Sequence, residues 1–289
     1  MKIEDLDMFF PYNSSVVYDA LTMPYQDPYL SHFALTDTLI ELADSQHQSS
    51  LHFWTEKDLI VLGMMDSKLP FLKKGLDFFK ENRYSYMVRN SGGLAVVSNE
   101  GILNFSIILP TPSTRTFTIN EGYQLMHGII QKAFEEYGQN ITAIEIPQSY
   151  CPGDYDLSIN GKKIAGIAQR RIRGGVAIMI YISISGNQDE RGQLIRSFYK
   201  EGLQNKQVKW DFPDVDPNVM TTLSEALHTE FTVEQAKEKI SRVFQLNGIS
   251  LHPAKYTQEN TKIYQKNLTK MIKRNEQLFD KTIKKEASL

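Results

Sequence analysis

Cysteine is almost absent from this 289-residue sequence: Cys151 is the only one. A single cysteine excludes an intrachain disulfide and a cysteine-rich metal site, and it fits a reducing compartment. Neither sign of charge dominates, since the formal net charge is −2, so we expect no overall attraction to nucleic acid or to an anionic membrane. No apolar run approaches the roughly 20 residues of a membrane span, and the N-terminus lacks the pattern of a signal peptide. These absences predict a cytoplasmic protein with neither nucleic acid nor membrane as a partner.

The sequence also lacks the signatures of common cofactor sites. Its six histidines show no HxxxH or HExxH pairing, so no metal site is expected. Neither a GxxxxGKS/T phosphate loop nor a GxGxxG dinucleotide motif is present, and we therefore expect no bound cofactor.

Apolar residues make up 41% of the chain, which is enough for a substantial core. Their periodicity predicts helices over 31–44, 69–80, 119–138, 188–204 and 232–248. Strands are predicted over 51–54, 58–63, 141–147 and 176–184, in MVRNSGGLAVV and LNFSIILP around a glycine turn, and in a hairpin over 156–168. This mixture predicts an α/β (α+β) catalytic domain over 45–250, an extension with a helix over 1–44, and a tail over 251–289.

The tail is predicted to form an amphipathic helix over 258–286 that packs on the main domain. Apolar side chains recur at helical spacing at Ile263, Tyr264, Leu268, Met271, Ile272, Leu278, Phe279 and Ile283. The other faces carry Lys262, Lys266, Lys270, Lys273, Arg274, Lys281, Lys284 and Lys285. One interpretation is a solvated basic face, and the other is a docking surface for an acidic partner.

Cys151 is the first candidate catalytic residue. The dipeptide Pro152-Gly153 follows it and forces an irregular loop, and loops on rigid scaffolds are common places for catalytic groups. The alternative is a buried, inert cysteine, which is the usual fate of a free thiol.

Lys163 is the second candidate. It follows the predicted hairpin turn, where successive side chains alternate, so Lys162 and Lys163 must point to opposite faces. We expect Lys163 to face inward beside Ala165 and Gly166, whose small size leaves room for a ligand. A lysine next to a thiol favours the reactive thiolate, so Lys163 is expected to activate Cys151 by charge proximity. The alternative is a turn lysine in solvent.

Two further segments have weaker signals. In RNSGGL, Gly92 and Gly93 permit either a plain turn or the close approach of a ligand to the backbone. Downstream, Arg170, Arg171 and Arg173 form either a solvated basic loop or a patch that receives an acidic partner.

Two of these segments resemble a known family. VRNSGGLAVVSNEGILNFSI is similar to the RRxSGGGAVxHDxGNLNFS signature of biotinyl and lipoyl protein ligases, and DLSINGKKIAGIAQRR is similar to their second, lysine-containing signature. The cysteine in SYCPGDYDLSI, just before the lysine hairpin, resembles the cysteine-dependent octanoyltransferases of this family. The resemblance covers roughly 45–250 and implies the ligase-like catalytic fold, with mixed sheets and flanking helices.

The resemblance also implies a mechanism. Cys151 would accept an octanoyl group as a thioester, and Lys163 would stabilise the developing oxyanion. By the same resemblance the acyl group and its carrier would contact Arg89, Ser91, Gly92, Gly93, Ala165 and Gly166. The implied donor is the octanoylated glycine cleavage H protein, and the implied acceptors are lysines of lipoyl domains in E2 subunits of 2-oxoacid dehydrogenases. Such carriers are typically acidic, which would suit docking on Arg170, Arg171 and Arg173.

The departures from the ligase signature argue against adenylation. Val88-Arg89, Gly92-Gly93-Leu94 and Ser98-Asn99 stand where the ligases have Arg-Arg, three glycines and His-Asp. A pre-activated thioester donor needs no ATP, and the cysteine supplies the covalent relay. The alternatives are an octanoyltransferase that uses acyl carrier protein as donor, an ATP-dependent lipoate ligase, and a non-catalytic carrier-binding module.

Overall fold

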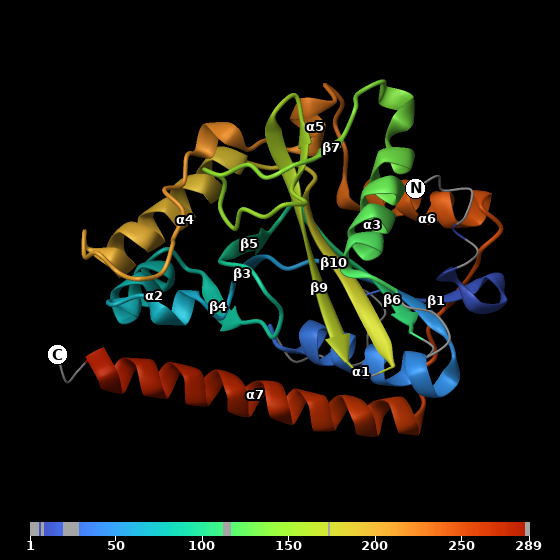
Figure 1. The fold of residues 1–289 in the computed structure, drawn as a ribbon, viewed down its shortest axis with the longest axis horizontal. Coiled ribbons are helices and arrows are strands. Elements are labelled where there is room, and N and C mark those ends of the chain that lie inside the picture. Colours follow the sequence, from blue (N-terminus) through green and yellow to red (C-terminus); the bar gives the residue numbers. More distant parts are fainter. Residues whose placement is uncertain (1–5, 7–8, 20–28, 112–116, 173, 287–289) are drawn as a thin grey trace.

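The computed structural model describes residues 6, 9–19, 29–111, 117–172 and 174–286 (Figure 1). Its larger sheet contains β1 (Ser14–Asp19), β2 (Ser49–Trp54), β6 (Ile102–Pro110), β7 (Thr142–Ala143), β8 (Leu157–Ile159), β9 (Lys162–Ile172), β10 (Gly175–Ser183) and β11 (Ser250–Pro253). These strands lie in the order β11-β1-β2-β6-β10-β9-β8-β7. Strand β1 is parallel to both of its neighbours, and the other pairs are antiparallel. The sheet is therefore mixed, as predicted.

A smaller sheet contains β3 (Asp58–Leu62), β4 (Ser85–Val88) and β5 (Val96–Asn99), in the order β4-β3-β5. The glycine segment 89–95 connects β4 to β5, which are separated by β3. The single strand predicted for MVRNSGGLAVV is therefore wrong, because this segment leaves β4 and crosses the end of β3 before it enters β5, whereas the expected glycine turn before LNFSIILP is present at Gly101. LNFSIILP forms β6 in the other sheet.

The helices flank both sheets. They are α1 (Ser31–Gln46), α2 (Leu72–Glu81), α3 (Ile119–Ala133), α4 (Gln188–Leu203), α5 (Leu223–Ala226), α6 (Val233–Leu246) and α7 (Gln258–Glu286). Short 3-10 helices cover Pro11–Asn13, Asp66–Lys68, Glu135–Tyr137 and Pro217–Val219. All the predicted helices are present, with the one expected over 119–138 divided between α3 and a 3-10 turn. None of the helices in the described ranges has the length and apolar composition needed to cross a membrane.

The larger sheet separates two apolar clusters. Along β10, Val176, Ile178 and Ile180 pack into the cluster that also contains α3 and α6. Ala177 and Tyr181, on the opposite face, pack with α1, the small sheet and α4. Because both faces of β10 are buried, apolar residues occupy successive positions, which explains the continuous apolar run in its sequence. In Figure 1, helix α7 lies along the side of the molecule that carries α1 and β4.

The hairpin over 156–168 is confirmed as β8 and β9. Its turn residues Asn160 and Gly161 have φ of 51° and 77°, the positive values that a two-residue hairpin turn requires. The strand predicted over 141–147 is wrong beyond Thr142–Ala143. Its later backbone N–H groups bond instead to Asp156: Ile144 to the carbonyl and Ile146 to the carboxylate.

The ends of the chain join the main body. Strand β1, from the predicted extension, pairs with β2, and β11, at the start of the predicted tail, pairs with β1. Helix α7 packs its buried residues Tyr264, Leu268 and Met271 into the cluster that contains α1. The three predicted parts therefore share the larger sheet, and α1 and α7 pack in the same apolar cluster as the small sheet.

Candidate active site

Cys151 lies in a loop with unfavourable backbone geometry. Its φ of 50° lies in the left-handed region, which a side chain disfavours. The loop is held from one side by the carboxylate of Asp156, whose Oδ2 accepts the N–H groups of Ile146 at 3.2 Å and Gly153 at 3.3 Å. This conformation turns the half-buried thiol toward the glycine segment.

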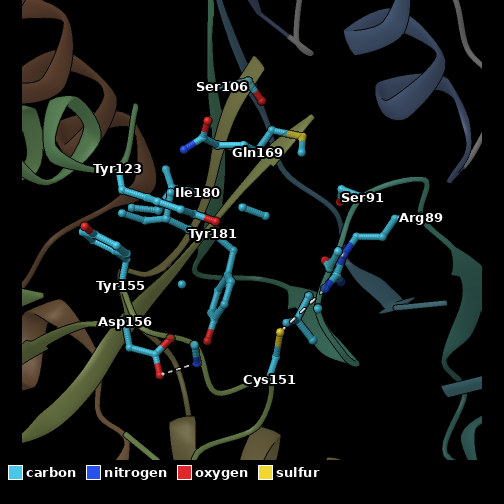
Figure 2. Close-up of a pocket in the computed structure, with 18 of the residues that line it drawn as sticks. Arg89, Ser91, Ser106, Tyr123, Cys151, Tyr155, Asp156, Gln169, Ile180 and Tyr181 are labelled. Carbon is cyan, nitrogen blue, oxygen red and sulfur yellow. Dashed lines mark hydrogen bonds between the residues drawn. The ribbon is translucent and has the colours of Figure 1, made fainter. Parts of the chain in front are cut away.

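Two donors from the glycine segment face the sulfur. The Leu94 N–H donates to Sγ at 3.1 Å, and Nη2 of Arg89 lies 3.6 Å from it (Figure 2). Both contacts stabilise negative charge on sulfur. A Cβ on Gly93, where φ is 96°, would lie 2.8 Å from Sγ and 2.4 Å from Nη2 of Arg89. Glycine at position 93 is therefore what lets the segment approach the thiol.

The Arg89 side chain is buried and also organises this segment. Its Nε donates to the Gly92 carbonyl at 2.9 Å, and its Nη2 donates to the Leu94 carbonyl at 2.8 Å. Its Nη1 donates to the carbonyl of Val61 in β3 at 3.2 Å. Arg89 was expected, by resemblance, to contact the acyl group or its carrier; the structure places its guanidinium against the sulfur.

Lys163 is almost fully buried, whereas Lys162 is exposed, as the alternation predicts. Its Nζ lies 2.9 Å from Oδ1 of Asp156 and donates to the carbonyls of Tyr150 at 3.0 Å and Cys151 at 2.8 Å. Its fourth partner is Oγ of Ser149 at 3.1 Å.

Activation of the thiol by the charge of Lys163 stays a prediction, and the structure adds a second cation beside the sulfur. Lys163 holds the backbone of the Cys151 loop, and the direct charged contact to the sulfur comes from Arg89. The Lys163 ammonium forms its ion pair with the carboxylate of Asp156, which lies beside it.

Sequence reasoning missed Asp156 as a site residue. Burial raises the pKa of its carboxyl group, and the neighbouring Lys163 ammonium opposes that rise. Asp156 stands at the start of the hairpin motif, so its position next to the candidate lysine was the available signal.

A polar chain behind the loop was missed as well. The hydroxyl of Tyr150 accepts from Nε2 of Gln188 at 3.1 Å, and Oε1 of Gln188 accepts from Nη1 of the buried Arg191 at 3.3 Å. Burial raises the pKa of Tyr150, so this hydroxyl stays neutral. These residues lie far apart in the sequence, and no local pattern indicated them.

The thiol opens into a cavity of about 590 Å³. Figure 2 shows Cys151 and Asp156 at one end and Ser106 at the other. Much of the wall is apolar, with Phe33, Trp54, Val61, Val96, Phe105, Met179 and Ile180. Four of the predicted substrate-binding residues besides Arg89 also line it: Ser91, Gly92, Gly93 and Gly166. Ala165 does not, because its side chain points to the other face of β9 and packs in the apolar core.

The wall is tight at Gly166. A Cβ there would lie 2.8 Å from the ring of Tyr181 and 3.6 Å from Cε of Lys163. The expected floor of small residues is therefore provided by Gly166 rather than Ala165.

The three arginines predicted to dock a carrier do not form one patch. Arg170 forms an ion pair with Asp37 of α1, with Nη2 2.9 Å from Oδ2, and donates to the Asn90 carbonyl at 3.0 Å. Arg171, on the opposite face of β9, is exposed and donates to the carbonyls of Phe117 and Thr118 near the start of α3. Arg173 lies outside the described residues. Strand alternation separates the two described arginines.

In the described part of the chain, no group of three or more His, Cys, Asp or Glu side chains is arranged to hold a metal ion. The polar groups at the Cys151 loop instead include the thiol, a lysine–carboxylate pair, a guanidinium and backbone N–H groups. This set is suited to acyl transfer, which needs a nucleophile and donors for a developing negative charge.

Comparisons with known proteins agree with this geometry. The family model of the lipoyl protein ligase A/B catalytic domain matches residues 28–245. An octanoyl-[GcvH]:protein N-octanoyltransferase of Oceanobacillus iheyensis is 40% identical over 248 residues, covering 86% of this chain and 88% of that protein. A protein of the same name from Bacillus velezensis is 38% identical over 283 residues, covering 96% and 98%.

A solved structure supports the fold. The bi-partite lipoate protein ligase of Thermoplasma acidophilum, studied with its E2 lipoyl domain, has a TM-score of 0.65 at 14% identity and covers 89% of this chain and 92% of that chain. This likeness confirms the ligase-like fold that the motifs predicted. By its family match and its relatives, the chain belongs to the lipoyl protein ligase A/B catalytic domain family.

Proposed function

We propose that this chain transfers an octanoyl group from the octanoylated glycine cleavage H protein to a lysine of an E2 lipoyl domain, through a thioester on Cys151. The observation that carries the proposal is the sulfur of Cys151 at one end of the cavity, facing the N–H of Leu94 and the guanidinium of Arg89. The name of the relatives supports the donor, and the lipoyl domain studied with the Thermoplasma ligase supports the acceptor class.

In the first half-reaction, Sγ of Cys151 attacks the carbonyl carbon of the octanoyl amide on the donor lysine. A C–S bond forms, the C–N bond breaks, and the donor lysine leaves as an amine that takes the thiol proton. The acyl chain lies along the apolar wall, where each buried methylene contributes about 0.8 kcal/mol of binding free energy. That binding fixes the carbonyl next to the sulfur.

In the second half-reaction, an acceptor lysine amine attacks the thioester carbonyl. A C–N bond forms, the C–S bond breaks, and the amine proton returns to the sulfur. Both half-reactions pass through a tetrahedral oxyanion beside Cys151. Arg89 contacts the sulfur and Lys163 bonds to the Cys151 carbonyl, and the positive charge of both side chains lowers the energy of that oxyanion.

The test is the intact mass of the purified protein after mixing with octanoylated H protein in the absence of ATP. We expect a gain of one octanoyl group on wild type, and its loss when an unmodified lipoyl domain is added. Cys151→Ala should gain nothing and should transfer nothing, because the nucleophile is absent.

Two controls identify the donor and the reaction. Octanoyl-acyl carrier protein in place of the octanoylated H protein distinguishes the two candidate donors, because only the true donor should acylate Cys151. Free lipoate with ATP tests for a ligase. Wild-type transfer by Cys151→Ala, or acylation only in the presence of ATP, would show that the thioester relay is wrong.

A further inference from the structure

The last residue of β4 is completed by a side chain from helix α7. Strand β4 is at the edge of the small sheet, so within the described residues no further strand pairs with its outer side. Oδ1 of Asn275 accepts the Val88 N–H at 2.7 Å, and its Nδ2 donates to the Val88 carbonyl at 3.1 Å. The Asn275 amide therefore pairs with both backbone polar groups of Val88, as a neighbouring strand would.

Val88 is followed directly by the residue whose guanidinium faces the thiol. The Arg89 N–H donates to the Leu62 carbonyl of β3 at 2.9 Å, and its carbonyl lies 3.5 Å from Nη2 of Arg274 in α7. Its side chain then runs inward to Sγ of Cys151. The backbone from which the guanidinium projects is thus held by β3 on one side and by α7 on the other.

Asn275 lies on the buried face of α7, where a polar side chain is stable only if its amide has hydrogen-bond partners. Tyr264, Leu268, Met271 and Asn275 recur at helical spacing, and all four are less than a tenth exposed. An amide in such a buried stripe is costly unless its polar atoms are paired. Here every polar atom has a partner, since Nδ2 also donates to the Met271 carbonyl at 3.1 Å.

We infer that Asn275 is a positioning residue for the reaction, through which α7 supports the backbone that carries Arg89. The helix lies beyond residues 28–245, the span of the family match. Asn275 holds the backbone of Val88, and Val88 in turn positions the backbone of Arg89. The Arg89 guanidinium and the Leu94 N–H are the two donors that face the sulfur. This inference rests on the proposed function for the nucleophile, but the reactivity of the sulfur can be measured without any acyl donor.

The experiment compares the rate at which iodoacetamide alkylates Cys151 at pH 7 in wild type and in Asn275→Ala. We expect alkylation to slow about 10-fold, because small displacements of supporting groups cost this much or more. With a small octanoyl thioester as donor, kcat should fall while KM stays the same, since the cavity walls are not altered. Asn275→Asp keeps an acceptor for the Val88 N–H and loses the donor, so its rate should be intermediate.

Two other variants in α7 serve as controls. Lys273→Ala changes an exposed residue of the same helix and should alkylate at the wild-type rate. Leu268→Ala removes packing seven residues before Asn275 in the same buried stripe, so it should lose stability but keep the alkylation rate.

A wild-type alkylation rate in Asn275→Ala would overturn the inference, as would an equal slowing in Leu268→Ala. If Asn275→Ala does not fold, Asn275→Asp decides: a slowed rate in the folded protein supports the inference, and an unchanged rate overturns it. Failure of the thioester proposal would appear separately, as transfer that survives Cys151→Ala.

Discussion

Lys163 and Asp156 form a buried ion pair behind the Cys151 loop, with 2.9 Å between Nζ and Oδ1. Replacing Lys163 by Met should leave the Asp156 carboxylate buried without a counter-ion, and it also removes the donor to two loop carbonyls. Breaking one partner of such a pair costs about 3–5 kcal/mol. We expect a loss of this order in the free energy of unfolding, measured with urea at pH 7.

Two further variants show whether the charge is the cause. Lys162→Ala should be close to neutral, because that side chain is exposed. Adding Asp156→Asn to Lys163→Met should restore part of the lost stability, since no buried charge then remains. Equal losses in the two lysine variants, or additive losses in the double variant, would contradict the assignment.

At the scale of elements, Arg170 of β9 and Asp37 of α1 hold the glycine segment through Asn90. Asp37 Oδ2 accepts from Nδ2 of Asn90 at 2.8 Å, and Arg170 donates to the Asn90 carbonyl. Arg170→Glu should therefore destabilise the protein and slow acylation by a small octanoyl thioester severalfold. Arg171→Glu should leave that small-donor rate unchanged, because Arg171 lies on the other face of β9. Stopped-flow acylation of both variants provides the comparison.

If Arg170 belonged to a carrier-docking surface instead, its charge reversal would slow transfer from the carrier and spare the small donor. The salt dependence of each rate separates the outcomes, since docking between exposed charges weakens as ionic strength rises.

Elements whose signals are local were predictable from the sequence. Asn160-Gly161 specifies its own turn, and Thr232 with Gln235 forms the capping box that starts α6. The segment 141–147 has the apolar alternation of a strand, yet most of it is a loop, because Asp156 takes its backbone N–H groups. That competition comes from a residue outside the segment, so no local pattern reveals it.

At the scale of the whole molecule, Asp66 connects the end of β3 to helix α4. Its carboxylate accepts from the Gly63 N–H at 2.7 Å and the Tyr199 hydroxyl at 2.8 Å. Burial raises the pKa of Asp66 from 3.8 to about 6, against the opposing effect of these bonds and of Arg89. The folded protein therefore retains a proton that the unfolded chain releases, and the free energy of unfolding falls as pH rises through this window.

From about pH 4 to about pH 6, wild type should lose about 2 kcal/mol more stability than Asp66→Asn, which has no charge to bury. Urea unfolding of both proteins across this range measures the difference. Parallel stability curves for the two proteins would show that Asp66 titrates at its ordinary pKa in the folded state.

The site was predictable only where its residues are close in sequence. Cys151 and Lys163 were found because one segment contains both the irregular loop and the lysine hairpin. The contacts of Arg89 and Leu94 with the sulfur were not predicted, although Arg89 was expected in the site, because both residues reach the thiol only when the glycine segment packs against the Cys151 loop. Such an approach depends on Gly63, where a Cβ would lie 1.8 Å from the Gly93 carbonyl oxygen; in the sequence this is an ordinary glycine.

The order of strands has a consequence for synthesis. Strand β1 lies between β2, made soon after it, and β11, made almost at the end of the chain. The amide of Asn275 reaches Val88 only after most of α7 has left the ribosome. Because domains are completed as the chain emerges from its N-terminus, a nascent chain contains the cysteine long before it contains the last support of the thiol's donors. The thiol is therefore expected to lack the full support of its two donors until α7 has been synthesised.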